Sequence, residues 1–248
     1  MSKPPVAPQR PPGRPDQETD LPLIGTQALS NQVTDFLMGQ IVSGNIRQGD
    51  RINEAELARR LGISRNPIRE AVNRLEERGL LIASPRRGHF VRSFSRKDID
   101  DLFAFRSTLE SFALQQGLPG MDAQDLDGLA GLVDEMEAAA TAGDEARVTA
   151  LDVSFHRRIC ELSGNGHTLH AFNGIEGEVQ MLIAFVDYGY TSLHAAAVDH
   201  WPVVEALRSR DPARATEALQ EHIRDAWSRI ARDYPEPGQN DHTQGRTE

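Results

Sequence analysis

The stretch from Asn53 to Arg92, NEAELARRLGISRNPIREAVNRLEERGLLIASPRRGHFVR, decides the fold of the N-terminal half of the chain. Asn53 is suited to cap a helix, and Glu56, three residues later, completes the pattern of a capping box. Gly62 is suited to end that helix, and Ser64 is suited to cap a second one. The stretch therefore begins as a helix, a turn and a second helix.

The second helix has an apolar face and a cationic face. A buried stripe is predicted by the i, i+3, i+4, i+7 spacing of Ile68, Ala71, Val72 and Leu75. Arg65 and Arg69 are four residues apart, so both project from the first turns, where a recognition helix meets base edges in the major groove of DNA. Ser64 and Asn66 lie at the same end of the helix. Arg74 lies on another side and is expected to meet phosphate.

A basic hairpin is predicted after the second helix. Gly79 provides a left-handed stop, and two short strands over 80–83 and 88–92 follow it. A glycine-containing tip with two arginines can approach the sugar-phosphate backbone or the minor groove closely. We therefore expect the wing of a winged helix-turn-helix, with DNA contacts from Arg86, Arg87, Gly88 and His89. The alternative is an amphipathic helical hairpin whose arginines form a solvated face, but the order of caps, turn, basic helix and basic hairpin favours DNA binding.

Charge is divided unevenly along the chain. The whole sequence has 27 Lys and Arg against 37 Asp and Glu, which by itself argues against a nucleic-acid partner. Residues 27–97, however, hold 13 basic and 7 acidic side chains, whereas residues 98–233 hold 10 and 24. The positive potential that phosphate binding requires is therefore confined to the first part of the chain.

Length and composition predict a mainly α protein with two modest domains. We expect a disordered arm over 1–24, a winged helix-turn-helix DNA-binding domain over 25–95, an all-helical domain over 96–233 and a disordered tail over 234–248. Periodicity and glycine punctuation place antiparallel bundle helices near 97–117, 123–141, 144–163, 167–189, 199–209 and 212–233.

The same features predict where the protein resides. The sequence has no stretch typical of a signal peptide and no apolar run of membrane-spanning length. Its single cysteine, Cys160, cannot form an internal disulfide, which is typical of a reducing compartment. We therefore expect a cytoplasmic protein with no membrane partner.

Four residues of the helical part are candidate metal ligands. Asp152 and His156 are four residues apart and share one helix face, while His200 and His222 lie on later predicted helices. One carboxylate and three imidazoles suit a divalent ion such as Zn²⁺, Ni²⁺ or Mn²⁺. Spacing alone leaves open that these are ordinary surface or core histidines, and His194 is an alternative to His200.

Two groups of motifs resemble a known family. The run ISRNPIREAVNRLEERGLL, followed by SPRRGHFV, resembles the winged-helix signature of the GntR family of bacterial transcription regulators. The later LDVSFHRRICELSGN and VDHWPVVEALRSRDPARATEALQEHI are similar to the helical FCD domain of its FadR-like branch. The resemblance covers roughly residues 27–232. Asn66 stands where the family often has threonine, and Ala55 where some members carry a base-contacting arginine, so the operator sequence stays open.

The resemblance implies a function and a ligand set. It implies a homodimeric transcription regulator, with repression relieved by a small organic acid, that binds a roughly palindromic operator on double-stranded DNA. By the same resemblance, the helical domain over 96–233 binds the effector and carries the dimer contact. In that family the aspartate and histidine of a D-x-x-F-H motif and two later histidines hold a metal. These positions fall on Asp152, His156, His200 and His222.

The resemblance also points to an effector-binding region. Arg106 and Glu110 lie on a helix that lines the effector cavity in the family, where an arginine could bind a carboxylate in bidentate fashion. The alternative for Arg106 and Glu110 is an i, i+4 pair on a helix surface. Asn165 is predicted as a helix C-cap, with a role in the cavity as the second possibility.

Two other functional classes are compatible with parts of the sequence. A metal-dependent enzyme also uses histidines and a carboxylate, but we find no general base or nucleophile near the cluster and predict no catalytic residues. An architectural DNA-binding protein with an inert bundle is the other alternative. A turnover assay tests the enzyme, and a bound metal or effector argues against the inert bundle.

Overall fold

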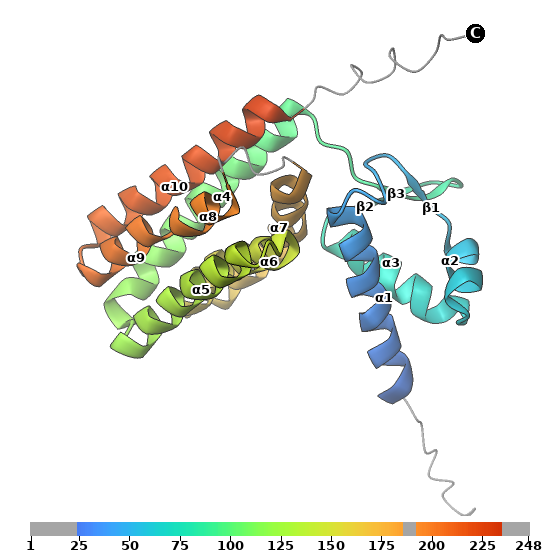
Figure 1. Ribbon diagram of the computed structural model, residues 1–248, viewed down its shortest axis with the longest axis horizontal. Coiled ribbons are helices and arrows are strands. Elements are labelled where there is room, and N and C mark those ends of the chain that lie inside the picture. Colours follow the sequence, from blue (N-terminus) through green and yellow to red (C-terminus); the bar gives the residue numbers. More distant parts are fainter. Residues whose placement is uncertain (1–23, 186–191, 235–248) are drawn as a thin grey trace, which may run out of the picture.

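The computed structural model describes residues 24–185 and 192–234, which form an N-terminal part with a small sheet and a larger helical bundle (Figure 1). The N-terminal part contains, in order, α1 (Ile24–Val42), β1 (Arg51–Ile52), α2 (Glu54–Leu61), α3 (Arg65–Glu77), β2 (Leu81–Ser84) and β3 (Gly88–Val91). The predicted winged helix-turn-helix followed by helices is confirmed.

The helix-turn-helix begins and ends where local chemistry dictates. The Asn53 side chain accepts a hydrogen bond of 3.1 Å from the Glu56 amide, and Gly62 ends α2 in the left-handed region at φ 68°. The Glu56 carboxylate pairs with Arg59 at 2.6 Å, so only half of the predicted capping box forms. Ser64 occupies the cap position of α3, but its side chain makes no capping hydrogen bond with the described residues.

The sheet has three strands in the order β1-β3-β2, all antiparallel. Leu81 pairs with Val91 and Ser84 with Gly88, so the hairpin tip is at 85–87, one residue shorter than the predicted connection over 84–87. Strand β1 and helix α1 were not predicted. Helix α1 packs against α3 and buries Leu37 and other apolar residues (Val33 and Ile41) beneath it.

The bundle contains α4 (Arg96–Gly117), α5 (Ala123–Thr141), α6 (Glu145–Leu162), α7 (Gly166–Phe185), α8 (Leu193–Val198), α9 (Trp201–Arg208) and α10 (Pro212–Asp233), with a short 3₁₀ helix at Leu118–Gly120. The prediction of six helices is wrong, because the described residues form seven α-helices here. Helix α8 was missed. The break before α9 has a local cause, since Pro202 lies in the first turn of α9 and cannot continue a preceding helix.

Some sequence-based predictions lie outside the described residues. They concern the arm over 1–23, the last part of the predicted helix at 186–189 and the tail over 235–248. The helices predicted near 97–117, 123–141, 144–163 and 212–233 are confirmed to within two residues at either end.

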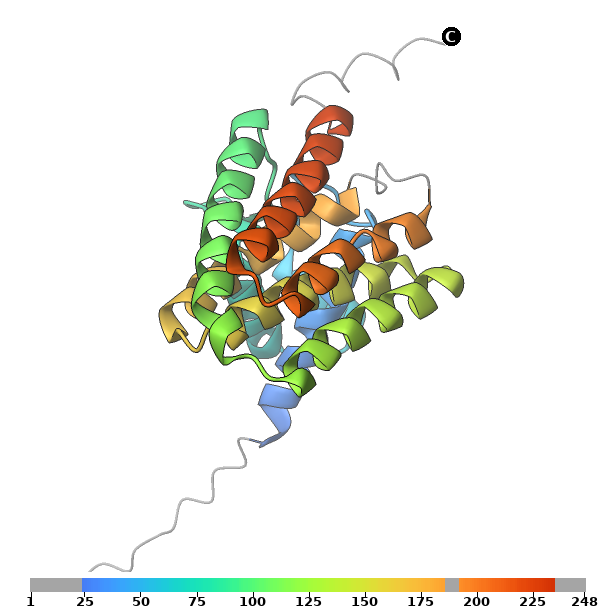
Figure 2. The ribbon, with the colours of Figure 1, turned by 90° about the vertical axis from the view of Figure 1, so that its left-hand side faces the viewer.

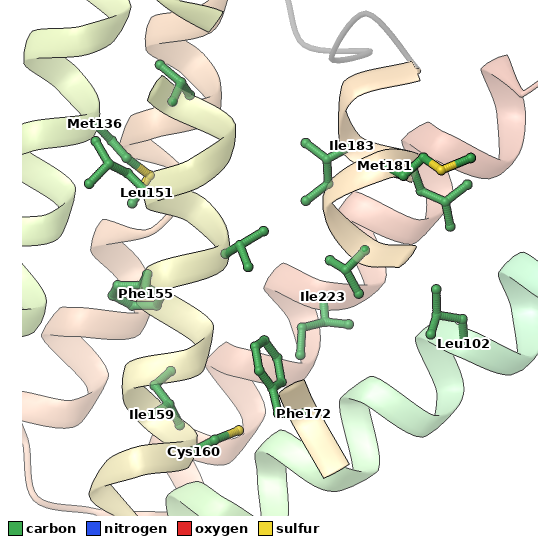
Figure 3. Packing of buried hydrophobic residues seen from close by; sticks show 14 of the residues in the cluster. Leu102, Met136, Leu151, Phe155, Ile159, Cys160, Phe172, Met181, Ile183 and Ile223 are labelled. Atoms are coloured by element: carbon green, nitrogen blue, oxygen red, sulfur yellow. The ribbon is translucent and has the colours of Figure 1, made fainter. Parts of the chain in front are cut away.

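Helix α6 lies at the centre of the bundle and packs against α4, α5 and α7. Figure 3 shows Phe155, Ile159 and Cys160 along α6, with Phe172 of α7 and Ile223 of α10 across the core. Helices α4 and α10 lie side by side in both ribbon views (Figure 2). Side chains on the inner faces of α4, α6 and α10 can therefore meet.

Candidate metal centre and DNA-facing surface

Three histidines from separate helices meet inside the bundle. His156 lies on α6, His200 at the start of α9 and His222 on α10; all three are buried, and one ring nitrogen of each lies within 4.8 Å of the others. Nε2 of His156 is 3.2 Å from Nε2 of His222. Asp152 joins them, with Oδ2 3.4 Å from Nε2 of His200 and Oδ1 4.0 Å from Nε2 of His156. We call these four residues the histidine site.

Aromatic packing holds the rings in place. The fully buried Phe155 meets the ring of His156 edge-on at 5.4 Å between centroids, and that of His200 at 5.0 Å. The rings of His156 and His222 stack at 5.1 Å. The orientation of the imidazoles is therefore part of the core packing.

Each imidazole has an acceptor behind its outer nitrogen. Nδ1 of His156 is within hydrogen-bond distance of Glu110, at 2.6 Å, whereas Nδ1 of His222 is 3.2 Å from Asp199 without hydrogen-bond geometry. Nδ1 of His200 lies 3.2 Å from two backbone carbonyls of α8. These acceptors favour a proton on Nδ1 and leave the Nε2 lone pair directed inward, which is the arrangement of histidines that bind a metal through Nε2.

The electrostatic environment favours metal ligation. Burial lowers the pKa of His156 and of His222, and the positive charge of neighbouring Arg106 lowers that of His156 further. Burial alone would raise the pKa of Asp152, but the polar contact with His200 and the nearby charge of Arg106 outweigh it, and this pKa falls below its usual range. A neutral His156 and a neutral His222 beside an ionised Asp152 are protonation states that suit a divalent metal.

Two atoms at the centre lack hydrogen bonds. Within the described residues, Oδ1 of Asp152 and Nε2 of His200 are buried and have no hydrogen-bond partner of acceptable geometry. Leaving such a group unsatisfied costs about 1–3 kcal/mol. A cation bound by these atoms would remove that cost, so the donor set fits a divalent metal.

Arg106 and Glu110 do not form the surface pair that the sequence allowed. Both side chains are buried, with Nε of Arg106 2.7 Å from Oε1 of Glu110, and Glu110 also contacts His156. Nη1 of Arg106 is buried without a hydrogen-bond partner among the described residues. Burial raises the pKa of Glu110, and the Arg106 charge opposes that rise. Arg106 thus offers a donor to an anion near the histidine site.

Asn165 caps a helix, and His194 is not part of the histidine site. Oδ1 of Asn165 accepts from the amide of His167 at 3.0 Å, so Asn165 caps the start of α7. The prediction of a C-cap is wrong, because Gly164 takes the left-handed conformation that ends α6. His194 is 60% exposed and lies 4.0 Å from Glu137, so His200, rather than His194, joins the other two histidines.

The predicted base-reading residues lie on one exposed end of α3. Ser64, Arg65, Asn66 and Arg69 are all exposed, and the Arg69 side chain is 62% exposed. Its guanidinium lies 3.8 Å from Glu54, a weak surface contact that phosphate or a base can replace. The cationic face at the start of α3 is therefore exposed.

The predicted wing residues divide into two groups. Arg86, Arg87 and Gly88 are exposed at the hairpin tip, where Arg86 adopts the left-handed region at φ 65°. His89 is half-buried, with Nε2 3.2 Å from Glu76.

Arg74 also differs from the exposed arginines of α3. It is half-buried and bonds to Asn31 of α1. We call the predicted DNA-binding domain, residues 25–95, the reader. Arg74 and His89 both make contacts within the reader, and DNA would have to compete with those contacts.

Comparisons with known proteins match both parts of the chain. Residues 29–91 match the family described as bacterial regulatory proteins, gntR family, and residues 101–225 match the FCD domain. The chain belongs to the GntR family. This GntR protein is therefore a transcriptional regulator rather than an enzyme, as the sequence predicted.

Two curated relatives cover most of the chain. One is a protein of Paenarthrobacter nicotinovorans named "Probable D-xylose utilization operon transcriptional repressor", 31% identical over 79% of this chain and 85% of its own length. Another is the HTH-type transcriptional regulator YdhC of Bacillus subtilis, 33% identical over 77% of this chain and 84% of its own.

Solved structures share the fold. E. coli McbR/YncC has a TM-score of 0.70 at 21% identity, covering 84% of this chain and 99% of that one. A GntR regulator from Rhodococcus sp. RHA1 has the same TM-score at 24% identity, with 84% and 100% covered. None of the helices that the structure describes is both long and apolar enough to span a bilayer.

Sequence reasoning missed the residues behind the histidines. Asp199 approaches His222, and Arg229 lies 3.0 Å from the same Asp199 oxygen. Asp199 lies within the run VDHWPVVEALRSRDPARATEALQEHI, but no role was predicted for it, and the packing of α8 against the rest of the bundle brings it to this position. The only local indication of this role is that Asp199 directly precedes His200 in the run VDHW. That position does not predict which histidine Asp199 contacts.

Proposed function

We propose that this GntR regulator binds operator DNA as a homodimer through residues 25–95 and senses a small carboxylate through residues 96–233. In this proposal a divalent metal, Zn²⁺, Ni²⁺ or Mn²⁺, occupies the histidine site. The observation that carries the sensing part is the gathering of three buried imidazoles and the carboxylate of Asp152 around one point. A buried polar cluster costs stability when its groups lack partners, and a bound metal would supply those partners. This argues against an inert bundle.

The effector site combines metal ligands with a cationic side chain. Asp152, His156, His200 and His222 would hold the metal, which supplies positions for carboxylate oxygens. Arg106 has a buried donor nitrogen with no hydrogen-bond partner in the described part of the chain. A guanidinium pairs well with a carboxylate. These features support an organic acid as the effector class.

A close contact between α7 and the reader supports a route for the response. Nη1 of Arg92, which follows β3, pairs with Glu178 of α7 at 2.9 Å. Gly177 lies so close to the Arg78 carbonyl that a Cβ there would collide with it. Helix α7 also packs against α6, which carries Asp152 and His156. A shift of α6 on effector binding would pass through α7 to the end of α3.

Repression relieved by effector is the proposed sign of regulation. The named function of the Paenarthrobacter relative, repression, supports it. The effector must bind the DNA-free arrangement of the two readers better than the DNA-bound one, because only such a difference shifts the equilibrium.

A thermal-shift screen of carboxylic and sugar acids tests the proposal. The full-length protein is screened with and without Zn²⁺, since a specific ligand stabilises the fold that binds it. We expect a stabilising acid whose effect requires the metal and which releases DNA selected in vitro from a random pool. Operator binding without any stabilising acid or metal would favour the architectural alternative.

A further inference from the structure

Two of the three imidazoles are backed by an arginine–carboxylate pair. Behind His156, Glu110 lies 2.6 Å from Nδ1 and 2.7 Å from Nε of Arg106. Behind His222, Oδ2 of Asp199 lies 3.2 Å from Nδ1, close enough for an ion pair but outside hydrogen-bond geometry, and 3.0 Å from Nη2 of Arg229. The two pairs come from different helices, so the repetition is not a consequence of one local motif.

The third imidazole has a simpler support. Nδ1 of His200 faces backbone carbonyls of α8 at 3.2 Å. Backbone carbonyls at the end of a helix are fixed in direction, so these two can orient the His200 ring without a side-chain acceptor. His156 and His222 lie within helices whose carbonyls are already bonded, and a separate acceptor must come from a neighbouring element.

We propose that Glu110 and Asp199 are positioning residues for the metal site. Each holds one imidazole with its proton on Nδ1 and its Nε2 lone pair directed at the centre. The inference rests on the proposed metal, and it assigns two residues that no ligand motif contains. Carboxylates in this position orient a metal-bound imidazole and raise its basicity.

The arginines complete each pair. A carboxylate buried beside the histidine site would add negative charge in a place where desolvation is costly. Arg106 and Arg229 neutralise Glu110 and Asp199, so each pair orients its ring without adding net charge. Asp152 is then the one ligand carboxylate that offsets the charge of the metal.

Glu110 uses both of its oxygens, which makes it sensitive to a small change. Oε1 accepts from Arg106 and Oε2 from His156. A glutamine has one acceptor oxygen and a donor amide. Glu110→Gln therefore cannot satisfy both partners, although it fills the same volume.

The test measures Zn²⁺ affinity of full-length protein by competition with a chromogenic chelator. Glu110→Gln and Asp199→Ala should each weaken Zn²⁺ binding by about 10- to 100-fold, the usual effect of removing such a carboxylate. Asp125→Ala is the matched control, because Asp125 also pairs with an arginine at 3.0 Å and is 26% exposed, against 29% for Asp199. It should bind Zn²⁺ like the wild type.

A second readout separates positioning from general loosening. In Zn²⁺-loaded wild type, ¹⁵N shifts of the histidine rings should show a protonated Nδ1 and a metal-bound Nε2 for His156 and His222. Asp199→Ala should change the ring of His222 and leave that of His156 as it was. This variant also keeps the test decisive if Glu110→Gln fails to fold, since Asp199 is partly exposed.

The outcomes distinguish this inference from the function on which it rests. A wild-type protein that does not bind Zn²⁺, Ni²⁺ or Mn²⁺ would overturn the proposed function, and this inference with it. Tight binding by the wild type, with unchanged affinity in both Glu110→Gln and Asp199→Ala, would overturn the positioning role alone. An equal loss in Asp125→Ala would also overturn it, because the effect would then be one of stability.

Discussion

The DNA-facing surface and the histidine site are built in opposite ways. Arg65 and Arg69 lie four residues apart on one helix, and both are exposed. The histidine site draws its ligands from α6, α9 and α10, and its three imidazoles are buried. One region depends on a short stretch of chain, and the other on the packing of the whole bundle.

This difference predicts how each region responds to substitution. A surface of exposed cations loses affinity in proportion to the contacts removed, and the fold beneath it persists. A buried site loses its geometry when a packing residue is removed, even one that binds nothing. Changes in one region should therefore leave the other intact, apart from the coupling through α7.

The largest expected effect is on packing around the histidine site. Phe155→Ala should cost about 3–5 kcal/mol of unfolding free energy, as such deletions in a core do. It should also weaken metal binding, because Phe155 touches the rings of His156 and His200. Urea unfolding measures the first effect and chelator competition the second.

The control for this change is Phe105→Ala. Phe105 lies on α4 and is 48% exposed, so its loss should change stability by about 0.5 kcal/mol or less. Similar losses in both variants would contradict the view that the site depends on its core.

The next effect is a pH dependence of the metal-free protein. Burial lowers the folded-state pKa of His156 and His222, so the unfolded chain takes up protons first as the pH falls. Their contribution to stability is complete above about pH 6.5, the ordinary histidine value, and is lost below it. As the pH falls below this value, each of the two histidines should lower the free energy of unfolding by up to about 1.4 kcal/mol per pH unit.

Urea unfolding of chelator-treated protein between about pH 7.5 and pH 5.5 measures this slope. His222→Gln should reduce it, while His194→Gln, at an exposed position, should leave it unchanged. Equal slopes in His222→Gln and the wild type would show that the buried imidazole of His222 is not the source.

The third prediction concerns the DNA-facing surface. Arg65→Ala or Arg69→Ala should cost about 1–3 kcal/mol of specific operator binding, the value of a good bidentate base contact. Arg86→Ala or Arg87→Ala should weaken binding to all sequences and reduce the salt slope by about one. Gel-shift titrations at several salt concentrations separate the two classes, and intact operator binding in every variant would refute the reader assignment.

The smallest effect is at the helix caps of the reader. Asn53→Ala should destabilise the protein by about 1 kcal/mol, because its side chain caps α2. Ser64→Ala should cost less, since the Ser64 side chain makes no capping bond among the described residues. Thermal unfolding of the two variants under one set of conditions gives the ranking, and the reverse order would contradict the observed geometry.

The reader was predictable because its signals are local. Gly62 and Gly79 both take left-handed conformations where helices were predicted to end, and the strands differ from prediction by one residue. Helix α1 was missed because its sequence, IGTQALSNQVTDFLMGQIV, lacks the strong two-faced pattern of α2 and α3. Strand β1 has two residues, too few for an alternating pattern.

The histidine site was predictable only in part. The i, i+4 spacing of Asp152 and His156 is local, but spacing could not select His200 over His194, and only the family resemblance did so. Glu110 and Asp199 reach the imidazoles through tertiary packing, which no local pattern encodes. The burial of Arg106 likewise depends on its neighbours, so a pair on a helix surface was equally compatible with the sequence.

The measurement that tests the central claim most directly is metal content by elemental analysis. Wild type, His222→Ala and His194→Ala are reloaded with Zn²⁺ under identical conditions, and operator binding is measured on the same samples. We expect about one ion per chain in the wild type and in His194→Ala, little in His222→Ala, and operator binding in all three. Full metal content in His222→Ala, or loss in His194→Ala, would contradict the account.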